Sequence, residues 1–440
     1  MSSNHEPSLQ PTGLSPAYAS RGDRMWDWPP EEIERWQLEC LNNQFQRMLP
    51  RNAFYRAKLG PHLKLASLAD LGQLPFTEKS ELVASATESE TGISTHHTYS
   101  PDTYSRMHRT SGTTGSPLMV LDTEEDWRWW SESWQPVLHS AQVTPQDRVF
   151  MAFSFGPFIG FWSAHQACVD RGALVIPGGG LSSIARLEFM RQAKATVVCC
   201  TPSYALHLIE VAEVERFRLG ELAVDRLIVA GESGGSIPAT RARIEHGWQA
   251  KVIDHSGATE IGPWGFGLPD RPGLHVNECS FIAELLPLSG VEDPDLYELV
   301  LTSLGRIGAP VIRYRTGDAV RAVRPGPEVT CRFLWLPEGI VGRVDNMVTI
   351  RGVNVFPSSV DAIVREFEAI VEYRVNVTRD RQLDQLSIEI EGDQSACEQL
   401  AKRMMLQLGL RVPVTLVEAG SLPRSEAKSR RWNDQRSHMH

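Results

Sequence analysis

Short apolar segments alternate with helical stretches between residues 147 and 257, and this pattern limits the fold more than any other feature of the chain. The apolar segments read RVFMAF, ALVIP, ATVVCCTP, RLIVAGE and KVIDHSG. Helical patterns such as IARLEFMRQAK and PATRARIEHGW lie between some of them. Strands that are apolar on both faces and alternate with helices are typical of a buried, mostly parallel α/β sheet.

The rest of the chain has other textures. Residues 30–72 carry apolar positions at three- and four-residue spacing and predict helix. From about residue 280, half-buried strand patterns predict a β-rich subdomain; they read FIAELL, YELVLTSL, VIRYRTGD and DAVRAV. Past Asp345 a turn at RGVNVFP precedes a helix, two strands and a second helix, which read SSVDAIVREFE, YRVNVTRD, LSIEIEG and ACEQLAKRMMLQLG. That order predicts a small α+β unit.

The chain of 440 residues exceeds what one hydrophobic core usually supports. We therefore expect an α/β protein in three parts. Residues 1–25, rich in Ser and Pro, are expected to be a flexible leader. Residues 26–344 are expected to form a large N-terminal domain with mostly parallel sheets and the β-rich subdomain. Residues 345–440 are expected to form a small, mobile C-terminal lid.

Charge and composition exclude several classes of protein. The net charge is −10 and no long basic run occurs, so nucleic acid is not an expected partner. No apolar run approaches the roughly 20 residues that span a bilayer, and the N-terminus lacks a signal-peptide pattern, so we expect a cytoplasmic protein that does not insert into membranes. The seven cysteines are scattered without a CxxC pair, which argues against a disulfide framework.

A Ser/Thr/Gly-rich segment, Thr110–Pro117, is the strongest local signal for chemistry. Hydroxyls and glycines at this density suit a turn whose amides and side chains hold phosphate oxygens. The segment does not match the GxxxxGK[ST] loop. Alone, it is equally compatible with an ordinary hairpin loop.

Further motifs follow in order: Gly231–Gly235, Asp254–Glu260, Tyr314–Asp318, Gly342–Asp345, Arg351–Pro357 and Pro423–Lys428. In this order and spacing they resemble the adenylate-forming superfamily of acyl-CoA synthetases, peptide-synthetase adenylation domains and luciferases. TPSY, GLHV, PVIRYRTGD and RGVNVFPSSV resemble its phenylacetate–CoA ligase-like branch. The resemblance covers roughly residues 70–432.

The resemblance implies ATP, Mg²⁺ and CoA as cofactors and gives each motif a role. Thr259 would bind the α-phosphate, Glu260 would hold Mg²⁺, and Lys428 would bridge the acid carboxylate and the α-phosphate; these three are the implied catalytic residues. Asp318 would accept both ribose hydroxyls, with Arg343 reaching the ribose or phosphate. Asp345 would be the hinge between body and lid, and Gly352 would border the CoA channel. The remaining implied ATP residues are Ser111, Gly112, Thr113, Thr114, Gly115, Gly231, Glu232, Ser233, Asp254 and His255.

The chain departs from the pattern of the family at three places. Ser116 stands where many relatives have a lysine, and Ser256 replaces a tyrosine that stacks on adenine, although the neighbouring His255 could stack in part. Some members of the branch carry a zinc cluster, for which this chain offers only His275, Cys279 and Cys331. Three scattered ligands fall short of a closed four-ligand site, so no structural zinc is expected.

The aromatic segment 153–162, FSFGPFIGFW, occupies the position of the acid-binding wall in this branch. Flat rings and glycines suit a planar substrate, although an aromatic core helix is nearly as good an explanation for any single residue. The residues expected to contact the acid are Phe155, Phe158, Trp162, Tyr204, Ser256 and Gly257.

These residues predict an ATP-dependent aryl acid–CoA ligase, of either the amino- or hydroxybenzoate type or the phenylacetate type. The departures favour a biosynthetic enzyme of secondary metabolism. Two alternatives stay open: an acyl-AMP ligase that loads a carrier protein or an amine, and a catalytically silent adenylate-binding homologue. The sequence does not decide whether the chain forms a homodimer.

Overall fold

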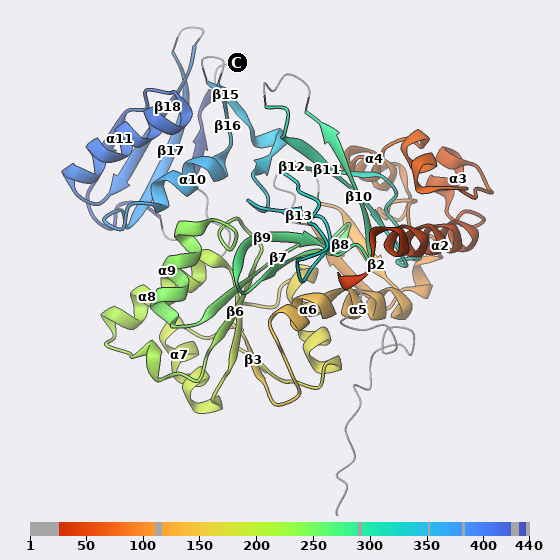
Figure 1. The fold of residues 1–440 in the computed structure, drawn as a ribbon, viewed down its shortest axis with the longest axis horizontal. Helices are drawn as coiled ribbons and strands as arrows, with labels where there is room; N and C mark the ends of the chain where they lie inside the picture. Colours follow the sequence, from red (N-terminus) through yellow and green to blue (C-terminus); the bar gives the residue numbers. More distant parts are fainter. Residues whose placement is uncertain are drawn as a thin grey trace, which may run out of the picture.

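The computed structural model describes residues 26–110, 117–288, 293–350, 353–380, 383–423 and 431–436. An eight-stranded sheet lies at the centre of the large N-terminal part, with strand order β13-β9-β8-β7-β6-β5-β3-β4 (Figure 1). Strands β3 to β7 pair in parallel, while β8, β9 and β13 extend the sheet in antiparallel pairing. The strands are β3 (Arg148–Met151), β4 (Leu174–Pro177), β5 (Val197–Cys200), β6 (Arg226–Ala230), β7 (Lys251–Ala258), β8 (Gly262–Leu268), β9 (Arg271–Val276) and β13 (Trp335–Leu336).

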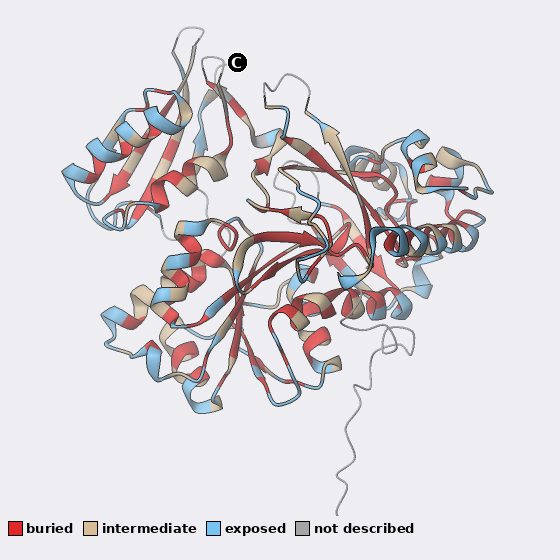
Figure 2. Ribbon diagram, viewed as in Figure 1, coloured by how far each residue is buried: buried red, intermediate tan, exposed pale blue. Residues whose placement is uncertain are grey.

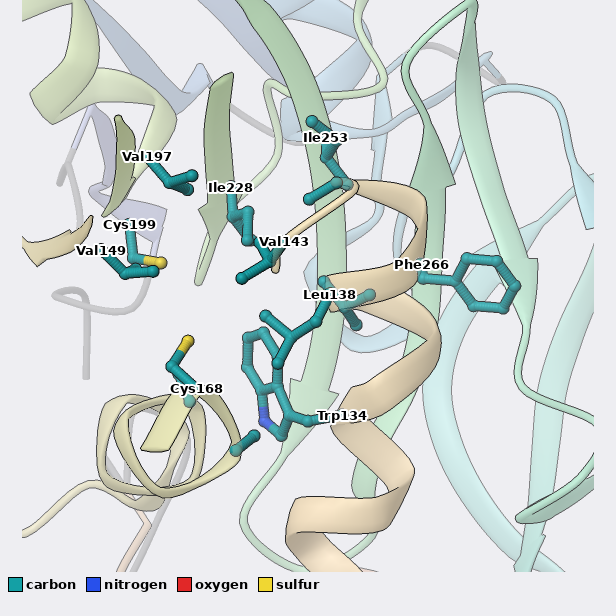
Figure 3. Packing of buried hydrophobic residues seen from close by; sticks show 14 of the residues in the cluster. Trp134, Leu138, Val143, Val149, Cys168, Val197, Cys199, Ile228, Ile253 and Phe266 are labelled. Atoms are coloured by element: carbon teal, nitrogen blue, oxygen red, sulfur yellow. The ribbon is translucent and has the colours of Figure 1, made fainter. Parts of the chain in front are cut away.

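Helices cover both faces of the parallel strands, as crossover connections require. They are α5 (Glu124–Ser140), α6 (Ile159–Asp170), α7 (Ser183–Ala193), α8 (Pro202–Val214) and α9 (Pro238–Trp248). Alternate strand residues point to opposite faces, so Val149 and Val197 pack with α5 and α6, whereas Phe150 and Val198 pack with α7, α8 and α9. Strand β5 is buried throughout and the middle of β3, β6 and β7 is buried, whereas the edge strand β4 is partly exposed (Figure 2). Figure 3 shows the first of these two cores, with Trp134 and Leu138 of α5 beside Cys168 of α6.

A second, antiparallel sheet of order β10-β11-β12-β14 forms the β-rich subdomain. The N-terminal helices lie on this side of the molecule (Figure 1). Its strands are β10 (Phe281–Pro287), β11 (Tyr297–Ser303), β12 (Tyr314–Val320) and β14 (Gly342–Arg343). The neighbouring elements are α2 (Pro30–Met48), α3 (Ala53–Leu59), α4 (Lys79–Glu88), and the hairpin of β1 (Arg106–Arg109) and β2 (Met119–Asp122).

The C-terminal unit has a hydrophobic core of its own. Its four-stranded sheet has order β19-β18-β17-β20, and the helix α10 lies beside α9 of the N-terminal part (Figure 1). The elements are β15 (Val348–Ile350), β16 (Val353–Val355), α10 (Pro357–Arg365), β17 (Glu372–Asp380), β18 (Leu383–Glu391), α11 (Gln394–Leu408), β19 (Val414–Leu416) and β20 (Trp432–Asp434).

The structure confirms the predicted fold class. It differs from the predicted helix over 30–72, because α2 ends at Met48 and a separate helix begins at Ala53. Pro50 lies between them, and proline cannot donate the hydrogen bond that would continue the first helix. The predicted turn at RGVNVFP contains a strand, since Val353–Val355 pairs with Val348–Ile350. Residues 1–25 lie outside the described part, so the expected leader stays a prediction.

Candidate active site

The loops that follow the five parallel strands lie at one edge of the sheet, because parallel strands present their carboxyl ends together. The sheet therefore gathers segments that are far apart in the sequence. They are residues 152–158 after β3, Gly178–Gly180 after β4, Thr201 after β5, Gly231–Ser236 after β6, and Thr259–Glu260 after β7. Open α/β sheets bind their ligands at this edge, so the fold supports the position expected for the site.

The loop Gly231–Ser233 folds back onto the start of α8. Gly231 has a φ of +94°, a conformation that favours glycine. The Glu232 carboxylate accepts a 2.8 Å hydrogen bond from the Ser203 backbone N–H in the first turn of α8. Ser233 is exposed. Glu232 thus holds the loop in place, while Ser233 is the side chain of the three that is open to a ligand.

Asp254 and His255 point to opposite faces of the sheet, as neighbouring strand residues must. Asp254 is buried and accepts hydrogen bonds from the Ser236 hydroxyl and from the His255 backbone N–H. Burial raises the pKa of Asp254 to about 6. The His255 ring packs 4.0 Å from the Trp134 ring, between centroids, and its Nδ1 lies 2.7 Å from the Gly265 carbonyl oxygen. The expectation that this imidazole stacks on adenine therefore differs from the structure, which places the ring in the core.

Thr259 and Glu260 form the turn between β7 and β8. The Glu260 side chain is buried, and its Oε1 lies 2.7 Å from Lys79 Nζ and 3.5 Å from the Tyr314 hydroxyl, which donates to it. The backbone carbonyls of Thr259 and Glu260 both accept from Arg306 Nη1, at 3.1 and 3.0 Å. Glu260 is therefore a carboxylate that already faces a cation, which fits a residue that binds a hard metal ion.

Lys79, Tyr314 and Arg306 are functional candidates that sequence reasoning missed. Lys79 begins α4, and no local motif marks it as a partner of Glu260, which is 181 positions further along the chain (260 minus 79). Tyr314 belongs to the quoted motif Tyr314–Asp318, but only the fold brings its hydroxyl to Glu260. Arg306 lies in the loop before β12, outside every motif.

Asp318 and Arg343 face each other across paired strands, since β12 and β14 place them directly opposite. Arg343 Nη1 lies 3.4 Å from Asp318 Oδ1 and donates a 2.7 Å hydrogen bond to the Thr316 carbonyl. The same guanidinium binds both oxygens of Asp345, at 3.0 and 2.9 Å. Burial raises the pKa of Asp318 to about 6, against the opposing effect of Arg343. The expected ribose residue, its neighbouring cation and the expected hinge thus form one cluster.

The aromatic segment after β3 forms a group of ring contacts. Phe155 is half-buried and meets Phe153 at 5.6 Å and Trp162 at 4.6 Å, between centroids. The indole N–H of Trp162 donates a 2.9 Å hydrogen bond to the Gly156 carbonyl. Phe158 and Trp162 are 48% and 43% exposed. These rings are partly open to solvent, so core packing alone does not account for them.

The other three expected acid-binding residues have different surroundings. Tyr204 lies in the first turn of α8 and is buried in the core, and its hydroxyl lies 3.1 Å from the Ser183 hydroxyl. The Arg186 guanidinium lies over the Tyr204 ring. Ser256 is half-buried opposite Gly265, and Gly257 is exposed at the end of β7. Ser256 and Gly257 are therefore at least partly exposed near the carboxyl end of β7, whereas Tyr204 is buried.

Several expected residues lie outside the described part of the chain: Ser111–Gly115 and Ser116 of the phosphate loop, Gly352, and Lys428. Among the described residues, no group of three or more His, Cys, Asp or Glu side chains could hold a metal ion. The absence of structural zinc stays a prediction. Within the same residues, no helix has the length and apolarity needed to cross a bilayer.

Two protein-domain families match successive parts of the chain. The family described as "AMP-binding enzyme" matches residues 55–282, and "AMP-binding enzyme C-terminal domain" matches residues 352–436. Phenylacetate-coenzyme A ligase of Escherichia coli (strain K12) is 32% identical over 438 residues, which cover 92% of this chain and 96% of the relative.

Solved structures give the same result. A 2-hydroxyisobutyryl-CoA ligase in the postadenylation state superposes with a TM-score of 0.87 at 27% identity, covering 97% of this chain and 95% of the other. The same ligase with CoA, in the thioesterification state, gives a TM-score of 0.71 at the same identity and coverage. The arrangement of the two parts is thus more similar to the postadenylation state. The chain belongs to the AMP-binding enzyme family, in its phenylacetate–CoA ligase-like branch, and is an AMP-forming acid–thiol ligase that uses ATP and CoA.

Proposed function

We propose that this ligase activates an aromatic carboxylic acid, of the aminobenzoate, hydroxybenzoate or phenylacetate type. The observation that carries the proposal is the contact between the Phe155 and Trp162 rings, with the exposed Phe158 between them in the sequence, in the segment that follows β3 and next to the glycines after β4. The Cβ position of Gly179 would lie 3.3 Å from the Phe153 carbonyl, so the glycine loop runs close against the aromatic segment. Rings beside a side-chain-free backbone suit a flat substrate.

The relatives support two classes of acid. The curated relative is a phenylacetate–CoA ligase, which favours an aryl acid. The relative with a solved structure is a 2-hydroxyisobutyryl-CoA ligase, whose acid is small and branched. The exposed rings favour the aryl class for this chain, because a small aliphatic acid would leave much of their surface in water.

We assign roles in the first half-reaction as follows. A carboxylate oxygen of the acid attacks the α-phosphorus, and the bond to pyrophosphate breaks. Thr259 would donate to the α-phosphate, and Asp318, once ionised, would accept from both ribose hydroxyls. Glu260 would hold Mg²⁺, which would offset phosphate charge. Lys79 supplies a second cation beside Glu260. This cation would take the place of the lysine that many relatives carry where this chain has Ser116.

The loop Gly231–Ser233 and Asp254 would border adenine, with Ser111–Gly115 on the terminal phosphates. Lys428 would reach the acid carboxylate and the α-phosphate, since a cation there offsets the repulsion between two anions. In the second half-reaction the thiol of CoA attacks the carbonyl carbon, the bond to AMP breaks, and a proton leaves the thiol. Asp345 would be the hinge and residues 345–440 the lid, with the CoA thiol passing Gly352.

Two alternative functions differ from this proposal, one in the molecule that accepts the acyl group and the other in lacking catalytic activity. A carrier protein or an amine could take the acyl group in place of CoA, and a silent homologue would bind nucleotide without reaction. The cluster of Asp318, Arg343 and Asp345 is intact, which argues against the silent reading.

The test is mass spectrometry of reactions that contain ATP, MgCl₂, CoA and one acid from a panel. The panel holds 2-aminobenzoate, 4-hydroxybenzoate, phenylacetate, hexanoate and 2-hydroxyisobutyrate. Acyl-CoA from an aryl acid supports the proposal. Acyl-AMP that persists in the presence of CoA favours another acceptor. Acyl-CoA from the aliphatic acids alone refutes the aryl assignment and leaves the ligase activity intact.

A further inference from the structure

Arg306 and Asp122 form an ion pair with no solvent exposure, directly behind the Thr259–Glu260 turn. Arg306 Nη2 lies 2.8 Å from Asp122 Oδ1, and Nε donates to the same oxygen at 2.9 Å. The Trp130 indole N–H also donates to Oδ1, at 3.1 Å, and the guanidinium lies 5.1 Å from the Trp130 ring centroid. Asp122 thus anchors the guanidinium in one orientation.

The other end of the guanidinium holds the turn. Nη1 donates to the carbonyls of both Thr259 and Glu260. A guanidinium carries its donors in a rigid plane, so its position on Asp122 fixes the position of these two carbonyls. One buried side chain therefore connects the end of β2 to the backbone that carries the proposed phosphate and metal ligands.

Stability alone explains this arrangement poorly. A buried ion pair costs several kcal/mol of desolvation per ion, and apolar residues of similar volume are often as stable. The pair also leaves Asp122 Oδ2 without a hydrogen-bond partner among the described residues. What the pair provides is a defined backbone geometry for the Thr259–Glu260 turn, whose two carbonyls accept from Arg306.

We infer that Arg306 is a positioning residue for nucleotide and metal binding: held by Asp122, it fixes the Thr259–Glu260 turn so that Glu260 can bind the divalent cation. The inference rests on the proposed roles of Thr259 and Glu260. Arg306 touches neither ligand and acts through the two carbonyls.

The chain contains a matched control at the opposite edge of the same sheet. Arg226, at the start of β6, lies 2.5 Å from Asp147 Oδ1 and donates to the carbonyls of Ala141 and Gln142. Its side chain also binds two carbonyls, and it pairs with Asp225 as well as Asp147, but the two carbonyls belong to the loop before β3. Lysine at either position keeps the charge and loses the planar donors.

The experiment measures ATP affinity by calorimetry at a series of MgCl₂ concentrations, together with the Tm, for wild type, Arg306→Lys, Arg226→Lys and Glu260→Gln. Mutation of residues that orient a metal ligand typically weakens metal affinity by about 10- to 100-fold. Arg306→Lys is therefore expected to raise the half-saturating MgCl₂ concentration by about that factor. Arg226→Lys is expected to lower the Tm without this shift. The double variant Arg306→Lys/Glu260→Gln should resemble Glu260→Gln, since both changes act on one ligand.

The inference is overturned if Glu260→Gln shifts the MgCl₂ requirement but Arg306→Lys does not. In that outcome Arg306→Lys, like Arg226→Lys, would differ from wild type only in Tm. A MgCl₂ requirement that Glu260→Gln leaves unchanged would instead refute the metal role of Glu260, and the inference with it. If Arg306→Lys does not fold, Asp122→Asn decides. This variant keeps the shape of the anchor and removes its charge, so it should give a smaller shift in the same direction, and no shift overturns the inference.

Discussion

Asp318 is a carboxyl group that has to be ionised for its proposed role in a place that favours the neutral form. Burial raises its pKa to about 6, because the charged form loses hydration. Arg343, 3.4 Å away, offsets only part of this effect. A ligand that needs the ionised carboxylate therefore binds more weakly as the pH falls through this value.

We predict that adenosine affinity is constant above about pH 7 and falls below about pH 6, by up to about tenfold per pH unit. Adenosine carries no phosphate, so titration of the ligand does not interfere in this range. Asp318→Asn should flatten the profile and weaken binding at high pH by roughly 1.5–3 kcal/mol, the contribution of hydrogen bonds to a charged group. Calorimetry between pH 5 and 8 measures both effects.

Asp254→Asn is the control, because burial raises the pKa of Asp254 to about 6 as well. Both of its oxygens are bonded within the protein, to Ser236 and to the His255 backbone. The pH profile of this variant should still fall below pH 6. A flat profile here, with an unchanged profile in Asp318→Asn, would move the ribose role away from Asp318.

Lys428→Ala is expected to abolish formation of acyl-AMP and to leave thioester formation from supplied acyl-AMP largely intact. If residues 345–440 are the proposed lid and present different faces in the two half-reactions, the lysine is needed in the first alone. Pyrophosphate release and acyl-CoA formation measure the two steps separately. Equal losses in both would contradict the assignment.

At this scale the sequence could predict residues inside motifs but not their orientations. The alternation of side chains along β7 implies that Asp254 and His255 face opposite sides of the sheet, which is inconsistent with one adenine pocket that both side chains line. No such signal exists for Lys79 or Arg306. Their partners are distant in the sequence, and single basic residues are common on any surface.

At the scale of elements, the segment from Phe153 to the start of α6 is the one that we propose to select the acid. The Phe155 ring is held by Phe153 and Trp162, which leaves a partly open aromatic surface. We predict that planar benzoate-type acids are used about ten- to a hundred-fold better in kcat/KM than hexanoate, since ring contacts contribute about 1–3 kcal/mol.

Phe155→Ala should remove most of that preference, whereas Val214→Ala, at an exposed position on α8, should not change it. The measurement is a kcat/KM series over benzoate, its amino and hydroxy derivatives, phenylacetate and hexanoate. Hexanoate at or above the best aryl acid would contradict the aromatic wall.

The parallel strands were predictable because each is apolar on both faces and is followed by a turn residue. Helix α5 was not predicted, although it supplies Trp134 and Leu138 to the core (Figure 3). Its interior contains Pro136 and several tryptophans, which obscure the helical pattern. The acid-binding role of Tyr204 was a motif-based expectation, and its burial against Ser183 became visible only in the packed fold.

At the scale of the whole molecule, Phe356 joins the two parts. It directly precedes α10, yet its ring is buried with Leu296 and Ala319 of the N-terminal part. A Cβ at Gly342 would lie 2.4 Å from the Phe356 ring, so only glycine leaves room for it there. The order of the motifs could predict two parts, but not the contact that holds them in this arrangement.

We predict that Phe356→Ala lowers the rate of acyl-AMP formation more than the rate of thioester formation from supplied acyl-AMP. The contact belongs to an arrangement similar to the postadenylation state, so its loss should shift the population away from that state. Single-turnover rates of the two steps give the ratio. Phe367→Ala, which alters the core of the C-terminal unit itself, is the control for stability. Equal slowing of both steps by Phe356→Ala would contradict the prediction.

Lys79 and Glu260 form a pair in which the lysine has to be exchanged before a metal can bind. A free divalent cation that bound Glu260 would lie close to the Lys79 ammonium and would bring no anion to which the ammonium could move. The repulsion between these two positive charges at short range is unfavourable. A cation that arrives already attached to a nucleotide brings phosphate oxygens, and these can take the displaced ammonium. The enzyme should therefore have little affinity for magnesium alone and should take up metal and nucleotide as one complex, because Lys79 occupies the Glu260 carboxylate until phosphate oxygens arrive with the metal.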